Sequence, residues 1–431
     1  MPSFLRPILS LLFGVALLLL GAGLLNTLVP VRASEVGFGD GLIGGLSSAY
    51  FAGFFIGTFI APTLVRRIGH IRAFAFYSVC CTCTALLHTL ADAAALWLLA
   101  RLLLGAALVG MYTVIESWLN AQAEPRHRGK VFATYMVVNL GALALSQQLL
   151  RIDAQAFVAF VLVALLISAA SLPVLLTRQA LPQFPPAPRL HLRRLFQTTP
   201  TAGAGALLSG LAMGAFWGLM PVYLVRAQLD AAAVGTVMSM TILGGAALQW
   251  PVGYLSDRFD RRLVLTLVCL TATVAALLVP LAVRHGAALM VVAFVFGGMA
   301  FAIYPIVVAH LVDHLPPEDL LAASSSALLL TGLGSALGPL VAGALMAGLG
   351  PNMLFAWFAL MLGGIAVFAA HRYRAFRRRR GTGGNFLPML RTSHASLDLL
   401  AEPAGAPRAP DDGADTGRDA TDQPSPPSSR P

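Results

Sequence analysis

Ionisable side chains are rare inside the long apolar stretches of this 431-residue chain, so each one is a candidate for chemistry. Arg101 and Glu116 lie in the same stretch, and a helical rise of ~1.5 Å per residue places them near its opposite ends. Arg101 could hold an anionic ligand, or it could extend outward and cap a helix. Glu116 could carry a proton or act in a gate, but we favour the simpler interpretation, an ion pair with Arg66 or Arg67.

Two clusters contain residue types that bind metals. His310, Asp313 and His314 would share one face of a helix, but they fall at the end of an apolar stretch, where such residues commonly meet water. Three of the four cysteines fall within residues 80–83, where successive helical side chains point apart and no partner pair follows. We therefore expect apolar packing of the cysteines, and neither a metal nor a cofactor.

Membrane-spanning helices must position these residues. Apolar residues make up 57% of the chain and charged residues 11%, with a mean hydropathy of +0.77, which leaves too little polar surface for a soluble protein of this length. A helix satisfies its own backbone hydrogen bonds in lipid. Twelve apolar stretches predict helices over residues 8–28, 41–65, 72–90, 95–119, 131–150, 154–177, 202–225, 231–255, 263–283, 287–311, 320–346 and 352–371.

Basic residues indicate the topology. An even number of helices places both termini on one side, and most of the 29 Lys and Arg residues lie in loops on that side. The opposite loops hold only Arg32, Arg151, Arg226 and Arg284. This bias predicts a multi-pass protein of the bacterial inner membrane with both termini in the cytoplasm. The net charge of +10 is thus an orientation signal, and we expect no nucleic-acid partner.

The chain divides into two helical parts, a linker and a tail. Residues 178–200 are polar and rich in Pro, and they predict a cytoplasmic linker between a six-helix bundle at 1–177 and another at 201–371. Residues 372–431 predict a disordered cytoplasmic tail. The tail contains a basic run that we expect to contact anionic lipid head groups, formed by Arg377, Arg378, Arg379 and Arg380.

The two helical parts repeat one another. Gly235 follows Gly44 by 191 residues, and Tyr304 follows Tyr112 by 192. A nearly constant offset over several helices indicates an internal duplication, which is typical of transporters built around a midplane site.

The loop after the eighth predicted helix resembles the G-x-L-x-D-R-x-G-R-R signature of the major facilitator superfamily. The matching residues are Gly253, Asp257, Arg258, Arg261 and Arg262, and Asp260 stands where the second glycine is usual. The loop after the second predicted helix is similar but degraded, with Pro62 for the first glycine, Arg66 for the aspartate, and Arg67 and Gly69 retained.

Other stretches extend the resemblance. Arg101 and Gly105 are similar to the R-x-x-x-G pattern of the superfamily's fourth helix. Small residues that permit close helix packing recur in the eleventh predicted helix, at Gly334, Gly338, Pro339 and Gly343. Residues 25–30, 47–51, 114–117 and 327–330 resemble the YcaD-like bacterial subfamily.

The resemblance implies an all-α fold of twelve transmembrane helices in two six-helix pseudo-repeats, and a monomeric secondary active transporter with alternating access. Helices 1, 4, 7 and 10 line the cavity in this superfamily, with contributions from 2, 5, 8 and 11. Mapped here, they nominate Arg101 and the aromatic and amide-rich set Asn26, Tyr50, Tyr112, Asn139, Gln147, Trp217, Gln249, Trp250 and Tyr304. That set suits a small amphipathic organic solute, and we expect proton coupling.

Two other functions stay open. One is a non-transporting sensor that signals through the tail, and the other is a membrane-embedded enzyme. No P-loop sequence occurs, so we do not expect this chain to hydrolyse ATP.

The resemblance also implies a gate. In the superfamily the signature aspartate faces the amino-terminal end of a helix in the other half, and Asp257 would meet the start of the fifth helix in this way. Arg66 has the opposite sign. We expect it to pair with Glu318 or Asp319, at the start of the eleventh helix, when the cytoplasmic side is closed.

Overall fold

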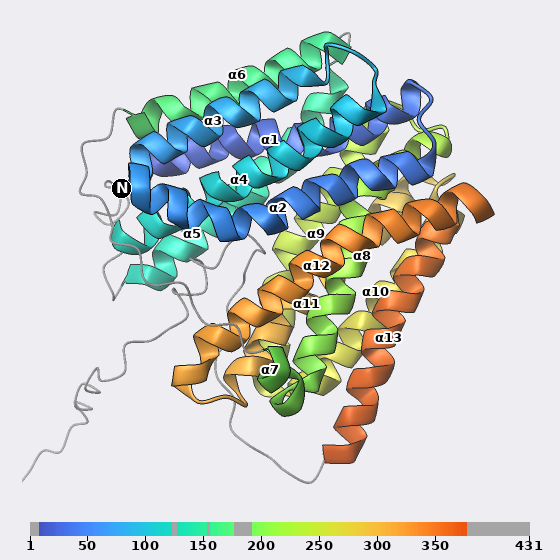
Figure 1. The fold of residues 1–431 in the computed structure, drawn as a ribbon. Helices are drawn as coiled ribbons and strands as arrows, with labels where there is room; N and C mark the ends of the chain where they lie inside the picture. The colour runs from blue at the N-terminus through green and yellow to red at the C-terminus, as the bar shows by residue number, and fades with distance from the viewer. Residues whose placement is uncertain (1–7, 123–126, 153–155, 176–191, 377–431) are drawn as a thin grey trace, which may run out of the picture. The chain divides into compact units, whose positions relative to one another are not determined.

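The computed structural model describes residues 8–122, 127–152, 156–175 and 192–376, and no strand occurs among them. Twelve helices of this described part are long and apolar enough to cross a membrane (Figure 1). The prediction of an all-helical membrane protein with twelve spanning helices is confirmed. Residues 372–376, which the sequence assigned to the tail, are helical, and the rest of the predicted tail, including the basic run at 377–380, lies outside the described residues.

The first six spanning helices form what we call the first half. They are α1 (Leu9–Glu35), α2 (Asp40–Ile68), α3 (His70–Leu87), α4 (Ala94–Gln122), α5 (Arg128–Gln148), which the short 3₁₀ helix η3 (Leu149–Arg151) extends, and α6 (Ala156–Leu175).

The second half contains α8 (Pro200–Arg226), α9 (Ala231–Arg258), α10 (Arg261–Ala282), α11 (Gly286–Val312), α12 (Pro317–Leu349) and α13 (Met353–Phe376). The short helix α7 (Leu192–Thr198) lies in the region predicted as a linker. α12 begins at Pro317 rather than at residue 320, because proline fits the first turn of a helix, where its missing N–H is not needed.

Apolar side chains cover the outside of the helices. Val137, Leu281 and Trp250 are 72%, 72% and 77% exposed, which is unfavourable in water but not in contact with lipid. Polar side chains such as Asn139 and Gln147 are instead buried between helices. The distribution is therefore that of a membrane protein.

Matching close contacts within the halves confirm the internal repeat. Gly105 of α4 packs against the carbonyl oxygen of Tyr50 in α2 so closely that a Cβ would overlap it. Gly297 of α11 packs in the same way against Thr241 in α9, at the equivalent positions of the second half. Only glycine permits such a backbone approach, so the repeated glycines set the same helix–helix distance twice.

Close contacts also join the two halves at one end of the bundle, which we call the Asp40 end. There Gly44 of α2 packs against the carbonyl oxygen of Pro339 in α12, and Gly235 of α9 packs against that of Gln147 in α5. In Figure 1, α2 and α12 run side by side toward this end and separate toward the opposite end, which carries Arg66. We call the latter the Arg66 end.

Candidate functional site

A cavity of about 190 Å³ lies between the two halves. The first half contributes α1, α2, α4 and α5 to its wall, and the second half contributes α8, α11 and α12. Its lining residues are Gly23, Asn26, Ser47, Tyr50, Phe51, Phe54, Phe55, Thr58, Arg101, Tyr112, Asn139, Leu143, Met213, Trp217, Gly218, Phe301, Tyr304, Leu328, Leu329, Thr331, Gly332 and Ser335.

Most of the residues nominated from the sequence meet at this cavity. Those that line it are Asn26, Tyr50, Arg101, Tyr112, Asn139, Trp217 and Tyr304. Three others lie elsewhere. The Gln147 amide connects α5 to α1, because Thr27 Oγ1 donates to its Oε1 at 2.6 Å and its Nε2 donates to the Gly23 carbonyl oxygen at 3.1 Å.

The other two residues lie on α9, which contributes none of the lining residues. Gln249 is buried at 3% exposure, whereas Trp250 faces outward and stacks on Tyr254 with ring centroids 6.2 Å apart. The sequence reasoning placed Trp250 in the cavity, and the structure corrects that placement. The glycines of α9 pack closely against α11 and α5. These contacts set the rotation of α9 about its own axis, and in that orientation Trp250 faces away from the cavity.

Arg101 faces the cavity and is only 3% exposed. Its Nη1 donates to Asn26 Oδ1 at 3.2 Å, and its guanidinium carbon lies 4.4 Å from the centroid of the Tyr50 ring, a cation–π arrangement. The sequence allowed two interpretations of Arg101, a ligand-binding side chain or one that extends outward and caps a helix. In the structure the side chain faces inward and does not cap a helix.

Glu116 is fully buried one turn further along α4 than the cavity residue Tyr112, and Tyr135 of α5 donates to its Oε1 at 3.2 Å. Arg66 and Arg67 are exposed at the end of α2. The ion pair that we favoured from the sequence is thus absent from the described contacts of the two arginines, and Glu116 interacts with the interior of its own half.

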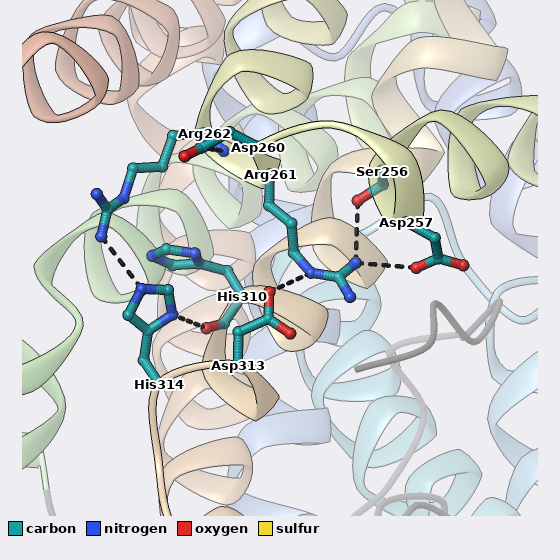
Figure 2. Close-up of polar contacts among 8 residues, drawn as sticks. All are labelled: Ser256, Asp257, Asp260, Arg261, Arg262, His310, Asp313 and His314. Carbon is teal, nitrogen blue, oxygen red and sulfur yellow. Dashed lines mark hydrogen bonds and ion pairs between the residues drawn. The ribbon is translucent and has the colours of Figure 1, made fainter. Parts of the chain in front are cut away.

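The signature-like loop of the second half forms a network at the Arg66 end (Figure 2). Arg261 is 5% exposed and lies between two carboxylates, with Nε 2.5 Å from Asp313 Oδ2 and Nη1 3.3 Å from Asp257 Oδ1. Nη1 also donates to Ser256 Oγ at 3.1 Å. The arginine therefore ties the end of α9 to the end of α11.

The histidine cluster belongs to the same network. His314 Nδ1 lies 2.9 Å from the His310 carbonyl oxygen, and its Nε2 lies 3.2 Å from Nη2 of Arg262 (Figure 2). The Arg262 guanidinium lies beside His314, and the Arg261 guanidinium contacts Asp313, so the cluster has a positively charged environment. The arrangement suits structural hydrogen bonding at the helix end, and no group of metal-binding side chains is found in the described part of the chain.

The sequence profile of the Major Facilitator Superfamily matches residues 11–198 and 202–399, which together cover most of the chain. The chain belongs to the major facilitator superfamily.

Relatives and solved structures agree with this assignment. An uncharacterized MFS-type transporter of Enterobacter sp. (strain 638) is 30% identical over 368 residues, covering 83% of this chain and 94% of the relative. The uncharacterized MFS-type transporter YcaD of Escherichia coli O139:H28 (strain E24377A / ETEC) is 30% identical over 367 residues, with the same coverage. The resemblance to YcaD-like proteins is thereby confirmed.

The fold is similar to the crystal structure of the nucleoside transporter NupG, with a TM-score of 0.69 and 16% identity, covering 87% of this chain and 100% of that one. This likeness concerns the fold alone. The chain is a multi-pass transporter of the bacterial inner membrane and not an enzyme, as its membership of a transporter superfamily shows.

The departure from the superfamily signature at Asp260 has a structural reason. The equivalent Gly69 in the first half has a φ of +83°, which favours glycine. Asp260 has a φ of −55° and caps α10, since its Oδ1 accepts a hydrogen bond from the Arg262 N–H at 2.8 Å. The second loop thus begins its helix with a side-chain cap and needs no glycine.

Some cavity residues were missed from the sequence. Phe54 and Thr58 follow Tyr50 at four-residue spacing on α2, and Phe51 and Phe55 form a parallel row. That spacing aligns the side chains on one face of the helix, and it could have indicated the cavity-facing side of α2. The lipid-facing side of α2 is also apolar, so the two sides could not be told apart from the sequence.

Proposed function

We propose that this transporter moves a small amphipathic organic solute across the inner membrane by alternating access, coupled to protons. The observation that carries the proposal is the cavity between the halves, which contacts between the halves close off toward the Asp40 end. An alternating-access carrier exposes such a site to one side at a time. The aromatic and amide side chains in the wall suit an amphipathic solute.

The Arg66 end faces the cytoplasm in this proposal. Basic residues gather at that end, among them Arg66, Arg67 and the three signature-loop arginines from 258 to 262, and the positive-inside rule supports the orientation. The conformation described here is then inward-facing. Outward opening requires the contacts at the Asp40 end to break while the halves move as two rigid bundles, and no second copy or cofactor is needed for that step.

Glu116 is the proposed proton site. It is a carboxyl group buried within a spanning helix, and carboxyl groups at such depth are typical of proton-coupled carriers. Tyr112, one helical turn earlier on α4, lines the cavity, and Tyr135 donates a hydrogen bond to Glu116 from α5. A rearrangement of the cavity wall can therefore alter the surroundings of the Glu116 carboxyl group through Tyr112 and Tyr135.

The test begins with ligand discovery. Purified protein is heated in the presence of small amphipathic organic compounds, since a compound that binds the folded state raises the unfolding temperature. Compounds that bind are then tested for uptake into proteoliposomes with and without an imposed pH gradient. We expect accumulation only with the gradient. Compounds that bind without being taken up, or accumulation that ignores the gradient, would contradict the proposal.

Glu116→Gln tests the proton site. We expect this variant to lose gradient-driven accumulation while it retains solute exchange, because exchange needs no net proton movement. Glu35→Gln is the control, since Glu35 is half exposed at the end of α1, where it pairs with Arg32 in the same helix. Equal effects of the two substitutions would exclude Glu116 as the proton site.

A further inference from the structure

The cavity carries a single positive charge. Among its 22 lining residues, Arg101 is the only Lys, Arg, Asp or Glu. No carboxylate stands in the wall to neutralise the guanidinium, and the side chain is 97% buried, as its exposure of 3% implies. Burying an ionised group without an opposite charge is costly, so this arrangement lowers the stability of the empty protein.

The described neighbours of the guanidinium are neutral. Nη1 donates to the Asn26 amide oxygen, and the Tyr50 ring lies beneath the guanidinium carbon. The Nε of Arg101 is buried without a hydrogen-bond partner, and so is Oγ of Ser47, another lining residue. Arg101 therefore keeps an unused donor and an uncompensated charge at the cavity wall, as a site for an oxyanion would.

The fold does not require this charge. By the repeat offset, Asn26, Tyr50 and Arg101 correspond to Trp217, Thr241 and Ala293 in the second half. The close helix contact beside them is the same in both halves, with Gly105 on Tyr50 and Gly297 on Thr241. An alanine thus satisfies the same packing position, and the arginine of the first half serves something other than the helix contact.

The wall that the second half contributes to the cavity is mostly apolar, and its hydroxyl-bearing members are Tyr304, Thr331 and Ser335. Trp217 and Phe301 form an edge-to-face pair with ring centroids 5.8 Å apart, and Met213, Leu328 and Leu329 are also apolar. All of these residues belong to the second half. A ligand that spans the cavity therefore meets a cation in one half and aromatic and aliphatic groups in the other.

We propose that the cavity selects an organic monoanion, with its oxyanion group on Arg101 and its apolar body against Trp217 and Phe301. This inference rests on the proposed function in taking the cavity as the substrate site, and it adds the charge and polarity of the substrate. A neutral solute leaves the guanidinium uncompensated. A dianion meets only one cation, so its second charge would have to be desolvated without a partner.

Paired probes test the charge selection directly. Binding of 2-naphthoate and of phenylacetate to the purified full-length protein is measured by calorimetry and compared with binding of the matching amides, and phenylmalonate serves as the dianion. We expect each monocarboxylate to bind about tenfold or more tightly than its amide, because a hydrogen bond to a charged group contributes more than a neutral one. We expect the dianion to bind more weakly than the monoanion.

Two arginine variants locate the effect. Arg101→Gln should abolish the preference for the acid over the amide, whereas Arg284→Gln, the same change at an exposed position outside the cavity, should retain it. Arg101→Lys keeps the charge and should keep part of the preference. The unfolding temperature of ligand-free Arg101→Gln should equal or exceed that of the wild type, since the substitution removes an uncompensated buried charge.

Each result decides the inference. Equal binding of acid and amide to the wild-type protein, no binding of either, or an intact preference in Arg101→Gln overturns it, and the wild-type comparison does not depend on how any variant folds. A preference for the monocarboxylates without uptake into proteoliposomes supports charge selection and refutes the proposed function. Uptake of neutral solutes without a preference for the monocarboxylates supports the proposed function and refutes charge selection.

Discussion

Asp40 of α2 and Arg226 of α8 form an ion pair that joins the two halves of the transporter. Both Nε and Nη2 of the arginine donate to Oδ1 of the aspartate, at 3.3 and 3.1 Å. Asp40 is the first residue of its helix, so the pair adds to the favourable position of a carboxylate at a helix amino terminus. The pair exists only while the halves meet at this end.

Removing this pair should favour opening at the Asp40 end. The arginine side chain is 40% exposed, so we expect Arg226→Gln to weaken closure by only about 1 kcal/mol, roughly a fivefold shift in population. Labelling of a cysteine engineered into the cavity from the Asp40 side would report the shift. Arg32→Gln is the matched control, because Arg32 pairs with Glu35 within α1 and not across the halves. A similar shift in both variants would show that the ion pair does not act in closure.

A methyl group at Gly44 should prevent closure more strongly. A Cβ there would overlap the carbonyl oxygen of Pro339, and backbone cannot move aside as a flexible side chain can. We expect Gly44→Ala to cost the closed state about 1–3 kcal/mol and to reduce transport accordingly. Gly45→Ala is the control, since its Cβ would meet the nearest atom, on Leu98, at 3.9 Å. The test compares the transport rates of the two variants at equal expression. Equal rates would show that closure does not depend on the contact between Gly44 and Pro339.

Arg261 should contribute more to stability than its neighbour Arg258. Arg261 is buried between Asp313 and Asp257, and its loss removes the buried cation that both carboxylates contact. We expect Arg261→Ala to destabilise the protein by about 3 kcal/mol. Arg258 is exposed and lies over the Tyr254 ring at 4.3 Å, so Arg258→Ala should cost less than about 1 kcal/mol. Thermal unfolding in detergent compares them, and a larger loss in Arg258→Ala would contradict this ranking.

The gate expected between the first signature-like loop and the start of α12 stays a prediction. Arg66 is exposed in this conformation, and the side chain of Glu318 lies outside the described residues. We expect Arg66→Glu to shift the carrier toward opening at the Arg66 end, because its charge would repel Glu318 and Asp319 on closure. Adding Glu318→Arg and Asp319→Arg should restore the balance. The accessibility of engineered cysteines from the cytoplasmic side measures the shift. A combined variant that is no nearer to the wild type than Arg66→Glu alone would refute the pairing.

The twelve helices and the internal repeat could be predicted from the amino-acid sequence alone. Both depend on local information, since about 20 apolar residues suffice to span a bilayer and a repeat offset needs no structure. The sequence also named Arg101 and Glu116 as candidates, because ionisable groups are rare within spanning helices, and their roles in transport stay predictions. Gly69 and Asp260 could be named as signature positions, but their different φ angles emerged only from the loops as folded.

The direction in which each side chain faces depends on how the helices pack, and it could not be predicted from the sequence. Trp217 lines the cavity while Trp250 faces outward, although the two residues have the same type and both lie in apolar helices. In a soluble helix a polar face would mark the outside. Here lipid makes the outside as apolar as the interior, so the pattern does not reveal a helix's rotation. Glycine contacts such as Gly105 on Tyr50 set that rotation, and they place Arg101 at the cavity wall.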